Sequence, residues 1–88
     1  MPKTKTAKEP YVLRPPAGML NARVVWYDPR SGSGRARSDT GKLLRIPLSA
    51  MRAAQLYALE PGTPIWVVVD EVDKMRIESL VIAGDSRP

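Results

Sequence analysis

The chain has 88 residues, of which 43% are hydrophobic and 26% charged, and it contains no cysteine and no histidine. This composition allows one small domain and excludes disulfides, thiolate or imidazole metal sites, and catalysis by a Cys or His side chain. Fourteen Lys and Arg against nine Asp and Glu leave a net charge of +5, which favours a polyanionic partner. The longest apolar run, residues 65–69, is far short of the about 20 residues that a membrane span needs, and the basic start lacks the apolar core of a signal peptide. We therefore expect a cytoplasmic protein without membrane contact, cofactor, bound metal or enzymatic activity.

Basic residues gather in the first part of the chain. Residues 1–52 hold eleven Lys or Arg against three Asp or Glu, a net charge of +8, whereas residues 53–88 have a net charge of −3. Residues 1–18 combine four prolines with four basic side chains, which predicts a flexible arm ahead of a folded domain over residues 19–83 and a short tail over residues 84–88. Two roles for the arm stay open: contacts to phosphates, or solubility alone.

The folded part begins with a predicted strand over residues 20–27, which is rich in β-branched and aromatic side chains. Leu20, Ala22 and Val24 share one face of this strand because successive side chains alternate. Residues 28–34 (DPRSGSG) are typical of a turn, since proline sets φ and glycine tolerates a positive φ.

Two shorter strands are predicted next, over residues 35–38 and 43–48. The second of these strands places Leu44 and Ile46 on one face and Arg45 and Pro47 on the other. Its Pro47 cannot donate a ladder hydrogen bond, so this position must lie at the end of a strand or at an edge of the sheet.

The only run of strong helix formers, residues 50–59, follows Ser49, a favourable N-cap residue. A strand over residues 65–70 and, after an acidic turn, a last strand over residues 75–82 complete the chain. In the last strand, one face is expected to carry Met75, Ile77, Ser79 and Val81. Five short strands with one helix between the third and fourth predict an all-β fold, a small barrel that leaves no open edge.

Two segments share their residue order with a known family. Residues 25–35 (VWYDPRSGSGR) carry a Trp-aromatic pair, an Asn-like Asp and two glycines at unbroken spacing, and residues 44–51 (LRIPLSAM) match a second signature. Leu59 and Gly62 continue the match toward the fourth predicted strand. Over roughly residues 20–82, the chain thus resembles the cold-shock domain, a five-stranded OB-fold barrel that binds single-stranded RNA and DNA.

The likeness is weaker at the residues that members of this family use for binding. They stack bases on aromatic side chains of the first three strands, and of these only Trp26 keeps its aromatic ring, with Tyr27 beside it. The positions where the family has phenylalanine or histidine hold Ser33, Arg35, Arg45, Pro47 and Leu48. Arginine compensates in part, because its planar guanidinium stacks on bases and pairs with phosphate.

The resemblance therefore implies a module that binds single-stranded nucleic acid, RNA or DNA, with a role in gene regulation. Binding is expected mainly through an arginine-rich sheet face with few stacking rings, so that phosphate contacts dominate. The candidate binding residues are Arg23, Trp26, Tyr27, Arg30, Arg35, Arg37 and Arg45.

Several alternatives stay open. A second hypothesis is a protein-interaction module or homodimer on the same scaffold, with Pro47 and Leu48 as an apolar patch. Strand periodicity leaves Trp26 and Trp66 each either in the core or at the surface, and the arginines are alternatively an ordinary solvated face. We interpret the GSG sequence at residues 32–34 as a hairpin turn and not a phosphate loop. The acidic residues at positions 70, 71 and 73 are interpreted as a hairpin tip and not a calcium loop.

Overall fold

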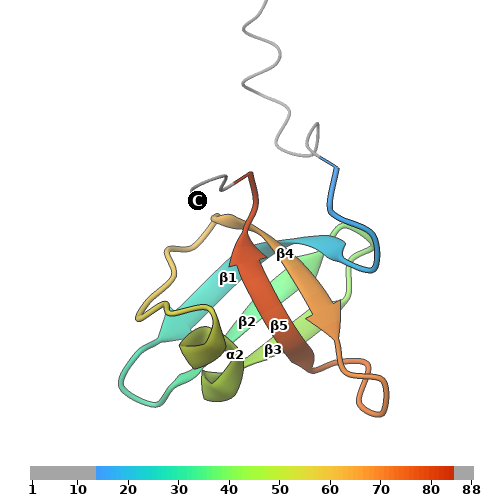
Figure 1. The fold of residues 1–88 in the computed structure, drawn as a ribbon. Helices are drawn as coiled ribbons and strands as arrows, with labels where there is room; N and C mark the ends of the chain where they lie inside the picture. The colour runs from blue at the N-terminus through green and yellow to red at the C-terminus, as the bar shows by residue number, and fades with distance from the viewer. Residues whose placement is uncertain (1–13, 85–88) are drawn as a thin grey trace, which may run out of the picture.

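The computed structural model describes residues 14–84, which form one antiparallel sheet of five strands with one short helix (Figure 1). The elements in chain order are β1 (Leu20–Asp28), β2 (Ser33–Ser38), β3 (Leu43–Pro47), α2 (Leu48–Ala53), β4 (Pro64–Val69) and β5 (Ile77–Ile82). Across the sheet the strand order is β3-β2-β1-β4-β5. The prediction of five strands with a helix between the third and fourth is confirmed. Residues 1–13 of the expected arm and residues 85–88 of the expected tail lie outside the described residues.

The turn between β1 and β2 forms where the turn residues predicted it. The backbone N–H of Arg30 donates to the carboxylate of Asp28 (2.9 Å), and Gly32 adopts a φ of +72°, which favours glycine. β2 begins at Ser33 rather than at residue 35, because Ser33 still pairs with Asp28 across the hairpin.

A β-bulge in β1 decides which way Trp26 points. Val24 and Trp26 pair with successive residues of β2, so Val25 has no partner there. The extra residue shifts the alternation of side chains by one. Val24 is buried, Trp26 is 41% exposed on the outer face, and Tyr27 packs against the core. The alternative of a core position for Trp26 is thereby excluded.

A second bulge corrects the pattern expected for the last strand. β5 begins at Ile77 rather than at residue 75, and its pairing with β4 skips Glu78. The bulge lets both Ile77 and Leu80 point into the core, three positions apart in the sequence. The prediction that one face carries Met75, Ile77, Ser79 and Val81 is therefore wrong, because only Ile77 among them is buried.

The helix is shorter than expected and lacks the expected cap. It spans Leu48–Ala53 instead of residues 50–59, and Leu48 therefore opens the helix rather than ending β3. Its N-cap position is Pro47, with no capping hydrogen bond from a side chain, so the assignment of Ser49 as N-cap is wrong.

A Schellman-type turn ends the helix early. The N–H of Leu56 donates to the carbonyl oxygen of Met51 (2.9 Å), and the N–H of Gln55 donates to that of Arg52 (3.0 Å). Gln55 occupies the left-handed position of this motif with a φ of +60°. Glycine usually fills that position, so the sequence carries no stop signal here and the extended helix prediction was wrong.

The buried side chains fill the space between the inner face of the sheet and α2. In β3, Leu44 and Ile46 are buried while Arg45 is exposed, and Pro47 ends the strand, as predicted. The core consists of Ala22, Val24, Ala36, Leu44, Ile46, Ala50, Met51, Leu59, Ile65, Val67, Ile77 and Leu80.

The edge strand β3 meets the residues just before the other edge strand, β5, at one point. The N–H of Arg45 donates to the carbonyl oxygen of Met75 (2.7 Å), and Arg45 forms an isolated parallel bridge with Arg76. Figure 1 shows the sheet curling so that β5 crosses in front of β2 and β3. Among residues 14–84 no continuous ladder joins the two edges, so the expected barrel is present only as a curled, open five-stranded sheet.

Candidate nucleic-acid interface

The bulge in β1 aligns one tryptophan and two arginines across three neighbouring strands. Trp26 pairs with Arg35 of β2, and Arg35 pairs in turn with Arg45 of β3. Arg23 and Arg37 form the preceding cross-strand pair on the same outer face. We call these five residues the arginine face. The structure thus brings five of the seven predicted binding residues onto one surface.

Arg35 lies over the ring of Trp26. Its guanidinium carbon is 5.7 Å from the centroid of the indole ring, within the range of a cation–π contact. The same guanidinium donates to the carbonyl oxygen of Gly34 (2.9 Å). Because Trp26 remains 41% exposed, a base that stacks on the indole would lie beside a planar cation.

Backbone carbonyls orient the two arginines of the preceding pair. Arg23 donates to the carbonyl oxygen of Gly62 (2.8 Å), and Arg37 donates to that of Gly41 (3.3 Å). Both acceptors are backbone carbonyls, so each of these bonds fixes the direction of a guanidinium group on the outer face.

Arg45 has an ionic partner, Asp73, which comes from the turn between β4 and β5. Arg76 forms a similar pair with Asp70, at 3.2 Å. Both side chains of the Arg45–Asp73 pair are more than two-fifths exposed, and such pairs contribute only about 0–1 kcal/mol to stability. A phosphate can therefore replace Asp73 as the partner of Arg45 at little energetic cost.

Asp70 organises the turn between β4 and β5. Its carboxylate accepts hydrogen bonds from the N–H groups of Val72 (2.7 Å) and Asp73 (3.1 Å) and from the guanidinium of Arg76 (3.2 Å). The backbone donors Asp73 and Val72, followed by the charge of Arg76, lower the pKa of Asp70 below its ordinary value of 3.8. The acidic residues are thus part of a hydrogen-bonded turn, and no metal-binding group of three or more His, Cys, Asp or Glu exists within residues 14–84.

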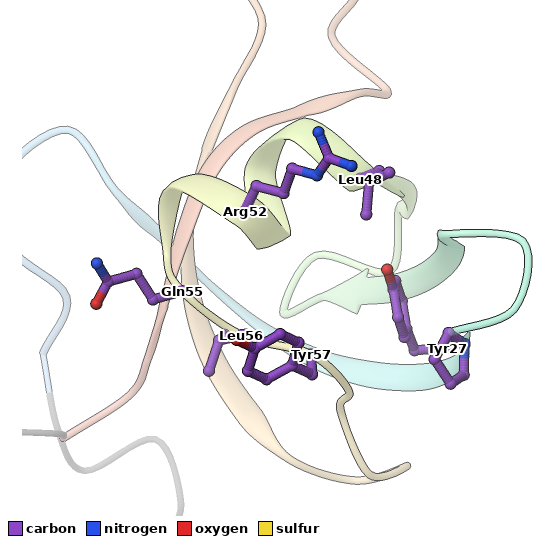
Figure 2. Close-up of a pocket in the computed structure, with 7 residues that line it drawn as sticks. Tyr27, Leu48, Arg52, Gln55, Leu56 and Tyr57 are labelled. Carbon is purple, nitrogen blue, oxygen red and sulfur yellow. The ribbon is translucent and has the colours of Figure 1, made fainter.

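Two of the predicted binding residues lie away from the arginine face. Arg30 is in the exposed turn between β1 and β2, and Tyr27 points toward the core side of the sheet. Tyr27 lines a hollow of about 730 Å³ beside α2, shown in Figure 2. The other residues that line it are Pro29, Leu48, Arg52, Gln55, Leu56 and Tyr57.

Sequence reasoning missed this hollow because it placed residues 50–59 in one continuous helix. The turn at Gln55 instead leads the chain away from the helix axis, and Tyr57 comes to lie opposite Tyr27. A glycine at position 55 would have indicated the turn, and the glutamine there gives no such signal.

The second tryptophan lies on the outer face of β4. Trp66 is half-buried between the inward-pointing Ile65 and Val67, and its Nε1 donates to the side-chain oxygen of Asn21 (3.1 Å). Trp66 is therefore a surface residue of the sheet that is fixed to its neighbouring strand, and it is not part of the core.

Comparisons with known proteins add no family assignment. The sequence matches no protein-family model, and it matches no curated protein. Within the described part of the chain, no helix has the length and apolar character needed to cross a membrane. The cold-shock resemblance accordingly stays a prediction from residue order.

Proposed function

We propose that this chain is a nucleic-acid-binding module, resembling a cold-shock domain, which binds single-stranded RNA or DNA through the arginine face. The observation that carries the proposal is the row of Trp26, Arg35 and Arg45 across β1, β2 and β3. An exposed indole supplies one stacking surface for a base, and the arginines around it supply phosphate contacts.

The proposal includes an OB-type arrangement of the strands. Two features support it. β1, β2 and β3 follow one another as neighbours in the sheet. Arg45 of β3 also forms a parallel bridge with Arg76, the residue just before β5. OB folds bind oligonucleotides on the face of their second and third strands. The arginine face covers that surface and extends it onto β1.

Binding in this mode depends more on phosphates than on bases. Each aromatic ring that stacks a base contributes about 1–3 kcal/mol, and the arginine face has one such ring. The remaining affinity comes from cations that contact phosphates, which makes binding sensitive to salt and tolerant of sequence.

The salt dependence of binding tests the proposal. The test measures the slope of log K against log salt for a single-stranded oligonucleotide, to which each phosphate contact contributes about 0.7. The double variant Arg35→Ala with Arg45→Ala loses two such contacts, so the magnitude of its slope should fall by about 1.4. The matched control, Lys42→Ala with Lys74→Ala, removes the same charge from exposed turns and should change the slope far less. An unchanged slope in the arginine variant, or an equal loss in the lysine control, contradicts a specific role for the arginine face.

A protein partner is the second candidate, and exposed apolar side chains favour it. Leu43 pairs with Arg37 across β2 and β3 and is 40% exposed, and Val25 is 39% exposed. Leu48, part of the apolar patch considered from the sequence, is 42% exposed. Concentration-dependent self-association that Leu43→Ser abolishes, without oligonucleotide binding, would favour this candidate over the first.

A further inference from the structure

The hollow beside α2 has the size of a ligand site and lies on the other side of β1 from the arginine face. Its volume of about 730 Å³ falls within the about 300–1,000 Å³ of small-molecule pockets. In Figure 2, Tyr27 lies below Leu48 at one side of the hollow. Leu56 and Tyr57 lie at the other side, and Arg52 extends from the helix above them. The side chain of Gln55 points away from the others.

The two tyrosines offer one fixed ring and one free ring. A Cβ atom on Gly34 would lie 2.7 Å from Cδ1 of Tyr27, so the ring of Tyr27 rests directly on the backbone of β2. Tyr57 is 91% exposed, and its hydroxyl makes no hydrogen bond with any residue of the described chain. Because a free aromatic ring loses little by moving, Tyr57 is suited to close over a planar ligand.

Arg52 gives the hollow a charge that no described residue neutralises. Its side chain is exposed, and it forms no ion pair or side-chain hydrogen bond with residues 14–84, whereas Arg45 and Arg76 are both paired with acidic residues. No Asp or Glu lines the hollow. The charge therefore favours an anionic ligand, and the tyrosines favour one that also has a planar ring.

We infer that the hollow binds one nucleotide of the same single strand that the arginine face holds, with its base against Tyr27 and Tyr57 and its phosphate at Arg52. This inference rests on the proposed function. Trp26 and Tyr27 are consecutive residues whose side chains lie on opposite sides of β1. A strand that leaves Trp26 enters the hollow by passing over the turn between β1 and β2, where Arg30 is exposed.

Oligonucleotides of two lengths separate the two surfaces. A strand of about four nucleotides covers the arginine face alone, and one of about ten nucleotides also extends into the hollow, within the about 4–16 nucleotides that one OB fold occupies. In full-length protein, Tyr57→Ala should weaken binding of the longer strand about five- to 150-fold, which corresponds to about 1–3 kcal/mol for one stacked base. Binding of the shorter strand should not change.

Two conservative variants identify the chemistry. Tyr57→Phe keeps the ring and should bind the longer strand as the wild type does. Arg52→Gln should lower the salt slope for the longer strand by about 0.7, and Arg52→Lys should restore it. Both side chains are exposed, so melting temperatures of these variants should match the wild type.

The outcomes distinguish failure of this inference from failure of the proposed function. If Tyr57→Ala binds both strands as the wild type does, the hollow takes no nucleotide while the arginine face stands. If neither strand binds the wild-type protein, both proposals fall. If Tyr57→Ala instead abolishes self-association in sedimentation equilibrium and leaves oligonucleotide affinity unchanged, the hollow is a protein interface and the inference is overturned.

Discussion

Trp26 and Tyr27 are neighbours in the chain, yet single-residue features give them opposite environments. The unpaired Val25 turns Trp26 to the outer face, where Arg35 lies over its ring. Tyr27 then points inward and pairs with Gly34, whose missing side chain leaves room for the ring. The exposure of one ring and the fixed position of the other thus depend on a bulge and on a glycine.

Replacing Gly34 should be destabilising because the space for a side chain is already filled. In Gly34→Ala the new Cβ would lie 2.6 Å from the carbonyl oxygen of Trp26 and 2.7 Å from the ring of Tyr27. Overpacking of this kind costs about 1–3 kcal/mol, measured as the free energy of unfolding in urea. Ser33→Ala, at the half-buried preceding position, removes only the exposed hydroxyl contact with Ser31 (2.9 Å) and should change it by about 0.5 kcal/mol, the low end for a hydrogen bond. Equal stabilities of Gly34→Ala and wild type would contradict the close packing of Tyr27 on β2.

At the scale of elements, two turns shape the hollow and the edge of the arginine face. The turn after α2 depends on Gln55 in a left-handed conformation, and the turn between β4 and β5 depends on the carboxylate of Asp70. The first places Tyr57 at the hollow, and the second presents Asp73 to Arg45.

Gln55→Gly should stabilise the protein. The left-handed backbone conformation of a residue with a side chain costs about 1–2 kcal/mol, which glycine avoids. Part of this gain is offset because glycine also raises the conformational entropy of the unfolded chain. We expect a net increase of up to about 1 kcal/mol in the free energy of unfolding. The matched change Ala53→Gly, at the last helical residue, should instead lower it by about 1 kcal/mol. Destabilisation by both changes would show that Gln55 is not in the conformation described.

Asp70 should make stability depend on pH in the acidic range. Since the folded-state pKa of Asp70 is lowered, its contribution is fully present above the unfolded-state pKa and is lost as the pH falls through the folded-state value. The difference in melting temperature between wild type and Asp70→Asn should be largest above about pH 5 and should shrink below the ordinary pKa of 3.8. Glu71→Gln, which removes a neighbouring exposed carboxylate, serves as the control. A difference that stays constant between neutral and acidic pH would contradict a stabilising role for the ionised carboxylate.

The strands were predictable because their signals are local, and the errors occurred where a bulge or a turn lacks a local signal. Alternation of Leu44 and Ile46 with Arg45 located β3 and its buried face. In contrast, nothing in the residues around Val25 or Glu78 announces a bulge, since bulges arise from pairing with a distant strand. The outward position of Trp26 followed only from the cold-shock resemblance, and the hollow was missed because the turn at Gln55 carries no glycine.

For the molecule as a whole, basic and acidic residues gather in different parts of the fold. The arginine face spans β1, β2 and β3, and the acidic turn after β4 contacts it at Arg45 through Asp73, where the sheet edges approach each other. A polyanion on β1 and β2 therefore meets cations that backbone carbonyls orient, and near β3 it competes with Asp73 for Arg45. This arrangement favours binding whose strength decreases steeply with salt.

The most direct measurement is the fluorescence of Trp26 during titration with short single-stranded oligonucleotides at two salt concentrations. Trp66→Phe removes the other indole so that Trp26 reports alone, and a duplex of the same sequence serves as the control. We predict quenching by the single strand at low salt that weakens sharply at high salt, because a base stacks on the indole and the arginines bind phosphates. Unchanged Trp26 fluorescence at low salt, with the protein folded, would contradict nucleic-acid binding at the arginine face.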